Sequence, residues 1–136
     1  MSLTQIHGAA VLVWMPVIGN FLLATWAGIT WLRGRRVLPP VFWPLLLLVL
    51  APLAVQAVAG LLLLSSVRPR TGLHLLYAVL VVFTAIAQYG LRPGGAVRRA
   101  VAAAPDALPE AQVLALLCLT QAGLIMRAWM TGLFGR

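Results

Sequence analysis

The stretch VFWPLLLLVLAPLAVQAVAGLLLLS (41–65) contains no charged residue, and its only polar side chains are Gln56 and Ser65. It is longer than the roughly 20 residues that an α-helix needs to cross the hydrocarbon core of a bilayer. Three more apolar stretches of comparable length lie at 6–32, 73–91 and 111–133. Together the four predict an all-α integral membrane protein, a single four-helix transmembrane domain over residues 1–136.

The composition supports this fold class. Hydrophobic residues make up 62% of the chain and charged residues only 9%, whereas soluble domains carry about 25% charged residues. The first stretch has no basic leader, so we expect a mature helix there and not a signal peptide. Because the connections are short, we expect an up-down-up-down bundle. Asp106 is a candidate N-cap for the fourth helix.

The positive charge lies at the ends of the apolar stretches. All ten basic residues are arginines, and the net charge is +8. Anionic lipid and membrane topology explain such a distribution, so nucleic acid is not an expected partner. The connections 33–36 and 91–110 together carry six arginines. The positive-inside rule therefore predicts that they face the cytoplasm, in a multi-pass protein of the bacterial inner membrane with both termini outside.

The chain has two histidines, His7 and His74, near the predicted outer ends of the first and third spans. In a four-helix bundle those spans are diagonal partners, about 12–14 Å apart. Two imidazoles with metal–nitrogen bonds of about 2 Å would bridge this distance and leave room for a flat macrocycle. Facing helices of bundles commonly hold cofactors in this way. The pair therefore predicts a bis-histidine haem b site with both histidines as metal ligands.

Several residues near the predicted outer end could support such a site. Gly60 lies about a turn below the end of its span, where a missing side chain leaves space. Arg68, Arg70 and Arg127 are candidate partners of the haem propionates, although binding to lipid phosphate explains Arg127 equally well and the loop pair Arg68 and Arg70 somewhat better. Met130 is the one substitute axial ligand expected near this layer.

Residues 56–82, QAVAGLLLLSSVRPRTGLHLLYAVLVV, resemble a segment of haem A synthase. In that family a Gln-x-x-x-Gly helix leads through a short outer loop to a helix that opens with a haem-ligating histidine. IHGAAVL (6–12) is similar to the stretch around a second family histidine. The resemblance covers about half of the chain and implies one four-helix, haem-binding half of the family. The family's catalytic glutamate is Thr4 here and its following arginine is Gly8, so the resemblance does not extend to oxidation of the haem farnesyl group.

These patterns predict a small haem protein that transfers electrons near the outer face or serves in a respiratory or photosynthetic redox complex. One alternative is a cofactor-free structural or assembly subunit, whose histidines are wetted by headgroups and whose apolar faces pack on other subunits or on a second copy. Another is binding of a chlorophyll-type pigment. No group of residues resembles a nucleophile with its base, so catalysis by the protein's own side chains is not expected.

The polar residues within the spans are few. Gln56, Gln88 and Gln121 are expected to form hydrogen bonds between helices, and a quinone headgroup is a less favoured partner for them. No Asp or Glu lies within a span. The sequence therefore lacks the ion site of a proton-coupled small multidrug exporter, which is another four-helix design.

Overall fold

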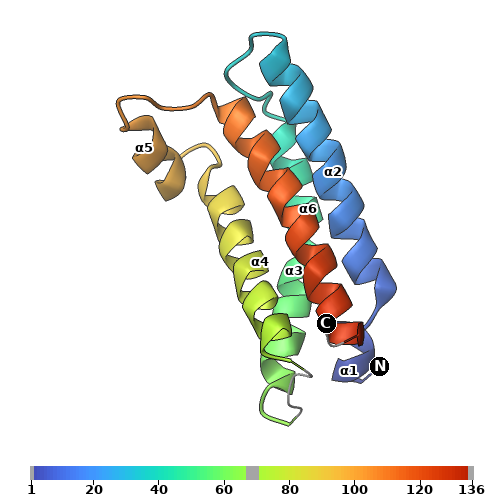
Figure 1. Cartoon of the computed structure of the whole chain (residues 1–136). Coiled ribbons are helices and arrows are strands. Elements are labelled where there is room, and N and C mark those ends of the chain that lie inside the picture. Colours follow the sequence, from blue (N-terminus) through green and yellow to red (C-terminus); the bar gives the residue numbers. More distant parts are fainter. Residues whose placement is uncertain (1, 67–70, 135–136) are drawn as a thin grey trace.

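The computed structural model describes residues 2–66 and 71–134, and it contains no strand within these ranges (Figure 1). Four segments are long and apolar enough to cross a membrane, Thr4–Leu32, Phe42–Leu63, Gly72–Gly90 and Glu110–Gly132. The all-α transmembrane fold class is thereby confirmed. The helices of the described ranges are α1 (Leu3–His7), α2 (Ala10–Leu32), α3 (Phe42–Leu63), α4 (Gly72–Gly90), α5 (Ala96–Ala102) and α6 (Glu110–Phe134).

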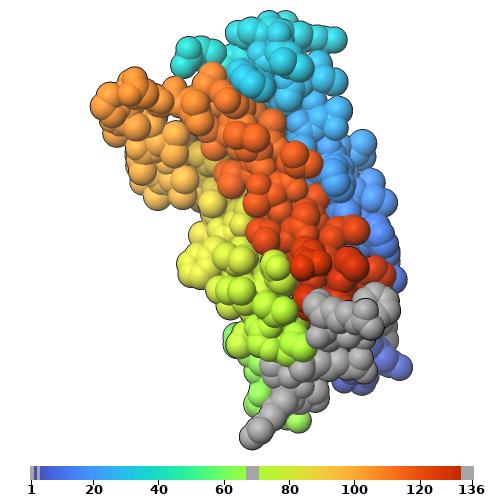
Figure 2. All heavy atoms as spheres, in the orientation of Figure 1, coloured from blue at the N-terminus to red at the C-terminus, as the bar shows by residue number. Residues whose placement is uncertain are grey.

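The four long helices form an up-down-up-down bundle in which α6 packs between α2 and α4. The most extensive helix contact is between α2 and α6, followed by α4 with α6 and α2 with α3, whereas α3 and α4 touch only sparsely. Figure 2 shows α6 running between α4 and α2 along one face of the molecule. The first and third spans are therefore diagonal in the bundle, as the sequence predicts.

Small residues allow α2 and α6 to pack closely. The buried positions of both helices recur every three or four residues, so they form one face on each helix. Alanines at many of these positions let the two backbones approach, which is how helices associate where lipid removes the hydrophobic drive. The buried residues of this contact include Val17, Asn20, Ala24 and Ala27 of α2, and Ala111, Leu114, Cys118 and Ala122 of α6.

The first span is interrupted, which the sequence did not predict. The short helix α1 begins with a capping box between Ser2 and Gln5 and ends at Gly8. Ala9 is extended, with φ −66° and ψ 116°, and α2 starts after it. His7 is thus the last residue of α1, which packs against α3. The break lets the histidine project from a separate element instead of continuing the face of α2.

The connections between α2 and α3 and between α4 and α6 meet at the other end of the bundle. Arg98 of α5 forms an ion pair with Glu110 at 2.6 Å, and the second Glu110 oxygen accepts from the Leu38 amide at 3.0 Å. The predicted cap is wrong, because α6 starts at Glu110 and Asp106 lies in a turn before it. Glu110 holds the two connections together instead.

Candidate functional site

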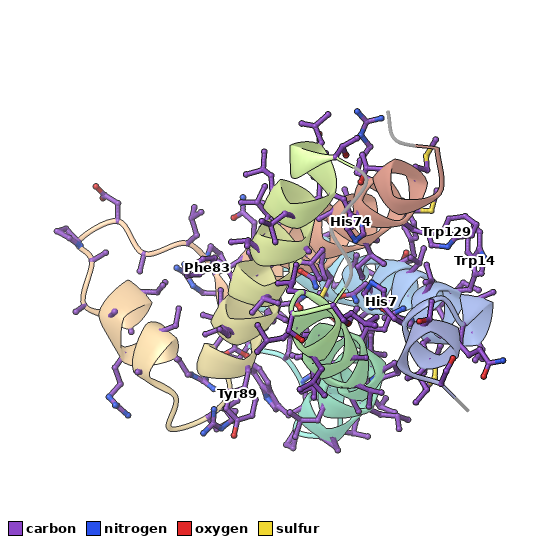
Figure 3. The ribbon with its side chains drawn as sticks, turned by 90° about the horizontal axis from the view of Figure 1, so that it is seen from below. His7, Trp14, His74, Phe83, Tyr89 and Trp129 are labelled. Atoms are coloured by element: carbon purple, nitrogen blue, oxygen red, sulfur yellow. The ribbon has the colours of Figure 1, made fainter. Side chains whose placement is uncertain are left out.

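The structure brings His7 and His74 together at one end of the bundle. Their ring centres are 6.1 Å apart and the ring planes are nearly perpendicular, at 87°. Both side chains are half-buried. Figure 3 looks at this end and shows the two imidazoles close together among the helices. The two histidines, which the sequence places at a similar depth, thus also lie close to each other in space.

A backbone carbonyl of α3 orients the ring of His7. Its Nδ1 lies 3.3 Å from the carbonyl oxygen of Gln56. In return, the Gln56 side chain donates to the His7 carbonyl at 3.5 Å. A carbonyl oxygen only accepts hydrogen bonds, so Nδ1 is the donor. In the neutral ring the lone pair therefore lies on Nε2, which is the nitrogen left to bind a metal.

A backbone carbonyl of α6 orients His74 in the same way. Its Nδ1 lies 2.8 Å from the carbonyl oxygen of Ala128, so Nδ1 is again the donor and Nε2 keeps its lone pair. Thr131 donates to the same carbonyl at 2.9 Å. The backbone of His74 is held too, because its amide donates to the N-cap hydroxyl of Thr71 at 3.3 Å.

Each histidine packs against a glycine one turn beyond the carbonyl that it binds. A Cβ added to Gly60 would lie 3.0 Å from Cε1 of His7, and one added to Gly132 would lie 3.0 Å from Cε1 of His74. Gln56 and Gly60 are four residues apart, as are Ala128 and Gly132. A helical carbonyl lies beside the residue four positions later. The missing side chain therefore opens the carbonyl to the imidazole.

Gly60 was expected from the sequence, whereas Gly132 and Ala128 were missed. The signal that could have found Gly132 is a glycine near the outer end of a span, as at Gly60, whereas nothing in the sequence marks Ala128, because every residue carries a carbonyl. Met130 does not serve this site. The residues that contact His74 are Ala128 and Gly132, and a helix places the residue midway between them on its opposite side. Met130 is exposed there.

The predicted arginines divide into two groups. Arg127 is exposed, and its guanidinium carbon lies 5.6 Å from the centre of the Tyr77 ring, which gives it a cation–π partner on α4. Arg68 and Arg70 lie outside the described residues. A further aromatic pair lies at this end, because Trp14 and Trp129 meet edge to face with ring centres 5.5 Å apart (Figure 3).

The glutamines form the hydrogen bonds between elements that the sequence predicts. Besides Gln56 with His7, Gln121 donates to the Val81 carbonyl at 3.1 Å. Gln88 donates to Asn20 at 3.0 Å and to the Cys118 sulfur at 3.3 Å. The contribution of Asn20 was missed. These bonds join α4 to α2 and α6 in the interior of the bundle.

Within the described ranges, no group of three or more His, Cys, Asp or Glu side chains is placed to hold a metal ion. The candidate site therefore consists of two neighbouring imidazoles, each held through Nδ1 by a backbone carbonyl. Comparisons with family models, curated proteins and solved structures found no match.

Proposed function

We propose that this protein is a small membrane haem b protein in which His7 and His74 supply the two axial ligands of the iron. The observation that carries the proposal is the pair of oriented imidazoles, whose ring centres are 6.1 Å apart. Two axial bonds of about 2 Å, together with the distance from each ring centre to its nitrogen, require ring centres about 6 Å apart. The spacing of the two rings therefore fits one iron between them.

The hydrogen bonds of the two rings support the same role. Histidine ligands usually donate their second ring N–H to a carbonyl or carboxylate, which fixes the ring and raises the basicity of the ligating nitrogen. His7 and His74 both do so, toward Gln56 and Ala128. Histidines retained only for packing would not both need to leave Nε2 available.

The pair also favours haem over a chlorophyll-type pigment. The magnesium of a chlorin commonly takes a single axial ligand, so a second histidine would be unused there, whereas haem iron takes two axial ligands. Among the neighbouring helices of the bundle, α3 and α4 pack least closely against each other. A planar group could be accommodated between these two helices with the least rearrangement of the bundle.

When bound, haem would supply one-electron redox chemistry. The protein would hold it rigidly, because both ligands are fixed to helix backbones, and would shield it with the apolar spans. Arg127 at the same end, together with Arg68 and Arg70, would balance the propionate charge. We further propose that this end faces outward in a bacterial inner membrane, and that the protein passes electrons alone or within a larger redox complex.

The visible spectrum of the purified protein, expressed with ample haem, tests the proposal. We expect a Soret band and sharp α and β bands after reduction. The variants His7→Asn and His74→Asn form the decisive pair. Asparagine can place its amide nitrogen near the position of Nδ1 and keep the hydrogen bond to the carbonyl, but it offers no nitrogen at the position of Nε2.

Each asparagine variant should lose the low-spin spectrum and retain its helical circular dichroism. A protein that is colourless after expression with haem would favour the cofactor-free structural role instead. Unchanged low-spin bands in both variants would show that the imidazoles are not the ligands. Strong red absorption in place of the α and β bands would point to a chlorin.

A further inference from the structure

A cavity of about 250 Å³ lies at the end of the bundle opposite the histidines. Its lining combines a tryptophan, several aliphatic residues, a threonine and two arginines. The residues that line it include Trp26, Ile29 and Thr30 of α2, and Arg33, Arg35 and Leu38 of the connection that follows. The cavity thus has both apolar and basic lining residues.

The chain reversal at the end of α2 brings the two arginines together. Gly34 has φ +76° and donates its amide to the Trp31 carbonyl at 2.8 Å, while the Arg35 amide donates to the Thr30 carbonyl at 3.1 Å. These two bonds form a Schellman motif, which requires a left-handed residue at the position of Gly34. Because the chain turns back there, Arg33 and Arg35 both lie beside the last turn of the helix.

The charge of these arginines is not compensated by neighbouring side chains. Among the described residues, the only ion pair joins Arg98 and Glu110, and neither Arg33 nor Arg35 donates a side-chain hydrogen bond to another of these residues. A second cavity, of about 530 Å³, shares Leu38 with the first, but its arginine is the paired Arg98. The first cavity therefore carries two positive charges that are available to an anion.

An exposed apolar stripe on α2 leads into the cavity. Ile18, Leu22 and Ile29 are 54%, 66% and 43% exposed, and their spacing of four and seven residues places them on one side of the helix. Ile29 also lines the cavity. A hydrocarbon chain lying on this stripe would reach the two arginines at its end.

We propose that the cavity binds the headgroup of an anionic phospholipid. Arg33 and Arg35 hold the phosphodiester through charge-assisted hydrogen bonds, and one acyl chain lies along Ile29 and Leu22. The cavity lies at the end of a membrane-spanning helix, which is the depth of the headgroups. A zwitterionic lipid fits less well, because its cationic group would meet the same two arginines.

The test uses the full-length protein stripped of lipid in detergent, with binding followed by native mass spectrometry. Phosphatidylglycerol should bind about tenfold more tightly than phosphatidylcholine with the same acyl chains, since both offer a phosphate but the choline ammonium would be repelled by the two arginines. The double variant Arg33→Gln with Arg35→Gln should lose this preference. Its matched control, Arg36→Gln with Arg99→Gln, removes the same charge from the same end but not from the cavity, and should keep it.

If both double variants lost the preference for phosphatidylglycerol equally, the attraction of anions would be unspecific. If neither lost it, the cavity would not be the binding site. Either result overturns the proposal. Competition with inorganic phosphate distinguishes a lipid site from a site for a soluble anion. Phosphate at similar concentration should not displace phosphatidylglycerol, and displacement would also overturn the proposal. Gly34→Ala tests the geometry without changing charge. It should weaken the preference, because alanine rarely adopts the required positive φ.

Discussion

The two ends of this bundle are held together in different ways. We call them the histidine end, which carries His7 and His74, and the arginine end, where the α2–α3 and α4–α6 connections meet. At the arginine end, large apolar side chains such as Phe42, Leu46 and Leu114 are fully buried, and Glu110 ties the connections together. At the histidine end, apolar contacts such as that of Trp14 with Trp129 are accompanied by hydrogen bonds to backbone, with one imidazole on a carbonyl of α3 and the other on a carbonyl of α6. The arginine end thus resembles an ordinary protein core, whereas the histidine end carries the candidate functional site.

Helix α4 shows what this difference means. Gln88 is its one buried residue, and its apolar side chains are half-buried or exposed. Three of its residues form hydrogen bonds with other helices. His74 and Gln88 donate from their side chains, and the Val81 carbonyl accepts from the side chain of Gln121. In a bilayer, apolar burial gives little drive for association, so such bonds and close backbone packing decide which helices meet. A helix held in this way can adjust around a cofactor at lower cost than one locked into a core.

The largest expected effect on stability lies at the arginine end. Phe42→Ala should lower the free energy of unfolding by about 3 kcal/mol, because it leaves a cavity among Trp26, Trp43 and the neighbouring helices. Unfolding in mixed micelles, followed by circular dichroism, measures the change. Under the proposed function, the variant that still folds should bind haem with the same affinity as the unsubstituted protein.

The matched control is Phe83→Ala, the same change at a position that is 66% exposed on α4 (Figure 3). It should alter the free energy of unfolding by well under 1 kcal/mol. Equal losses in the two variants would mean that the arginine end is not a packed core, and the contrast between the two ends would fail.

A smaller change at the histidine end should affect binding more than stability. In Gly132→Ala the new Cβ would lie 3.0 Å from Cε1 of His74, so the ring must give way by a few tenths of an ångström, which disturbs its hydrogen bond to the Ala128 carbonyl. Disturbing the partner of a metal-ligating histidine typically costs about 10- to 100-fold in affinity. Haem titration measures the loss. Gly123→Ala, in the same helix with open space around it, should leave haem affinity unchanged, and a similar loss there would refute the positioning role of Gly132.

The smallest effect concerns the ion pair of the arginine end. Glu110→Gln removes the charge that binds Arg98 but retains an oxygen for the Leu38 amide. Because Arg98 is partly exposed, the cost should be about 1 kcal/mol, and it should shrink in high salt. Chemical unfolding at two salt concentrations measures it. Asp106→Asn, in the exposed turn, should show neither effect.

The sequence predicts the spans well because the signal is strong and local. Four long apolar runs, bounded by arginines, prolines and glycines, can satisfy their backbone in lipid only as helices. The diagonal placement of His7 and His74 also follows, since short connections leave few bundle topologies. The break after Gly8 and the start of α6 were not predicted, because a shift of one turn hardly alters the hydropathy of a span.

What the sequence by itself determined is therefore the class of fold and the depth of its polar residues. The tertiary structure alone decided which groups those residues meet. Every residue carries the same backbone carbonyl, so nothing in the sequence marks Gln56 and Ala128 as the acceptors for the two imidazoles. The same holds for Asn20 as the partner of Gln88 and for Gly34 as the residue that draws Arg33 and Arg35 together. Such choices depend on how helices are rotated and spaced, and these quantities are fixed by the packing of all four helices at once.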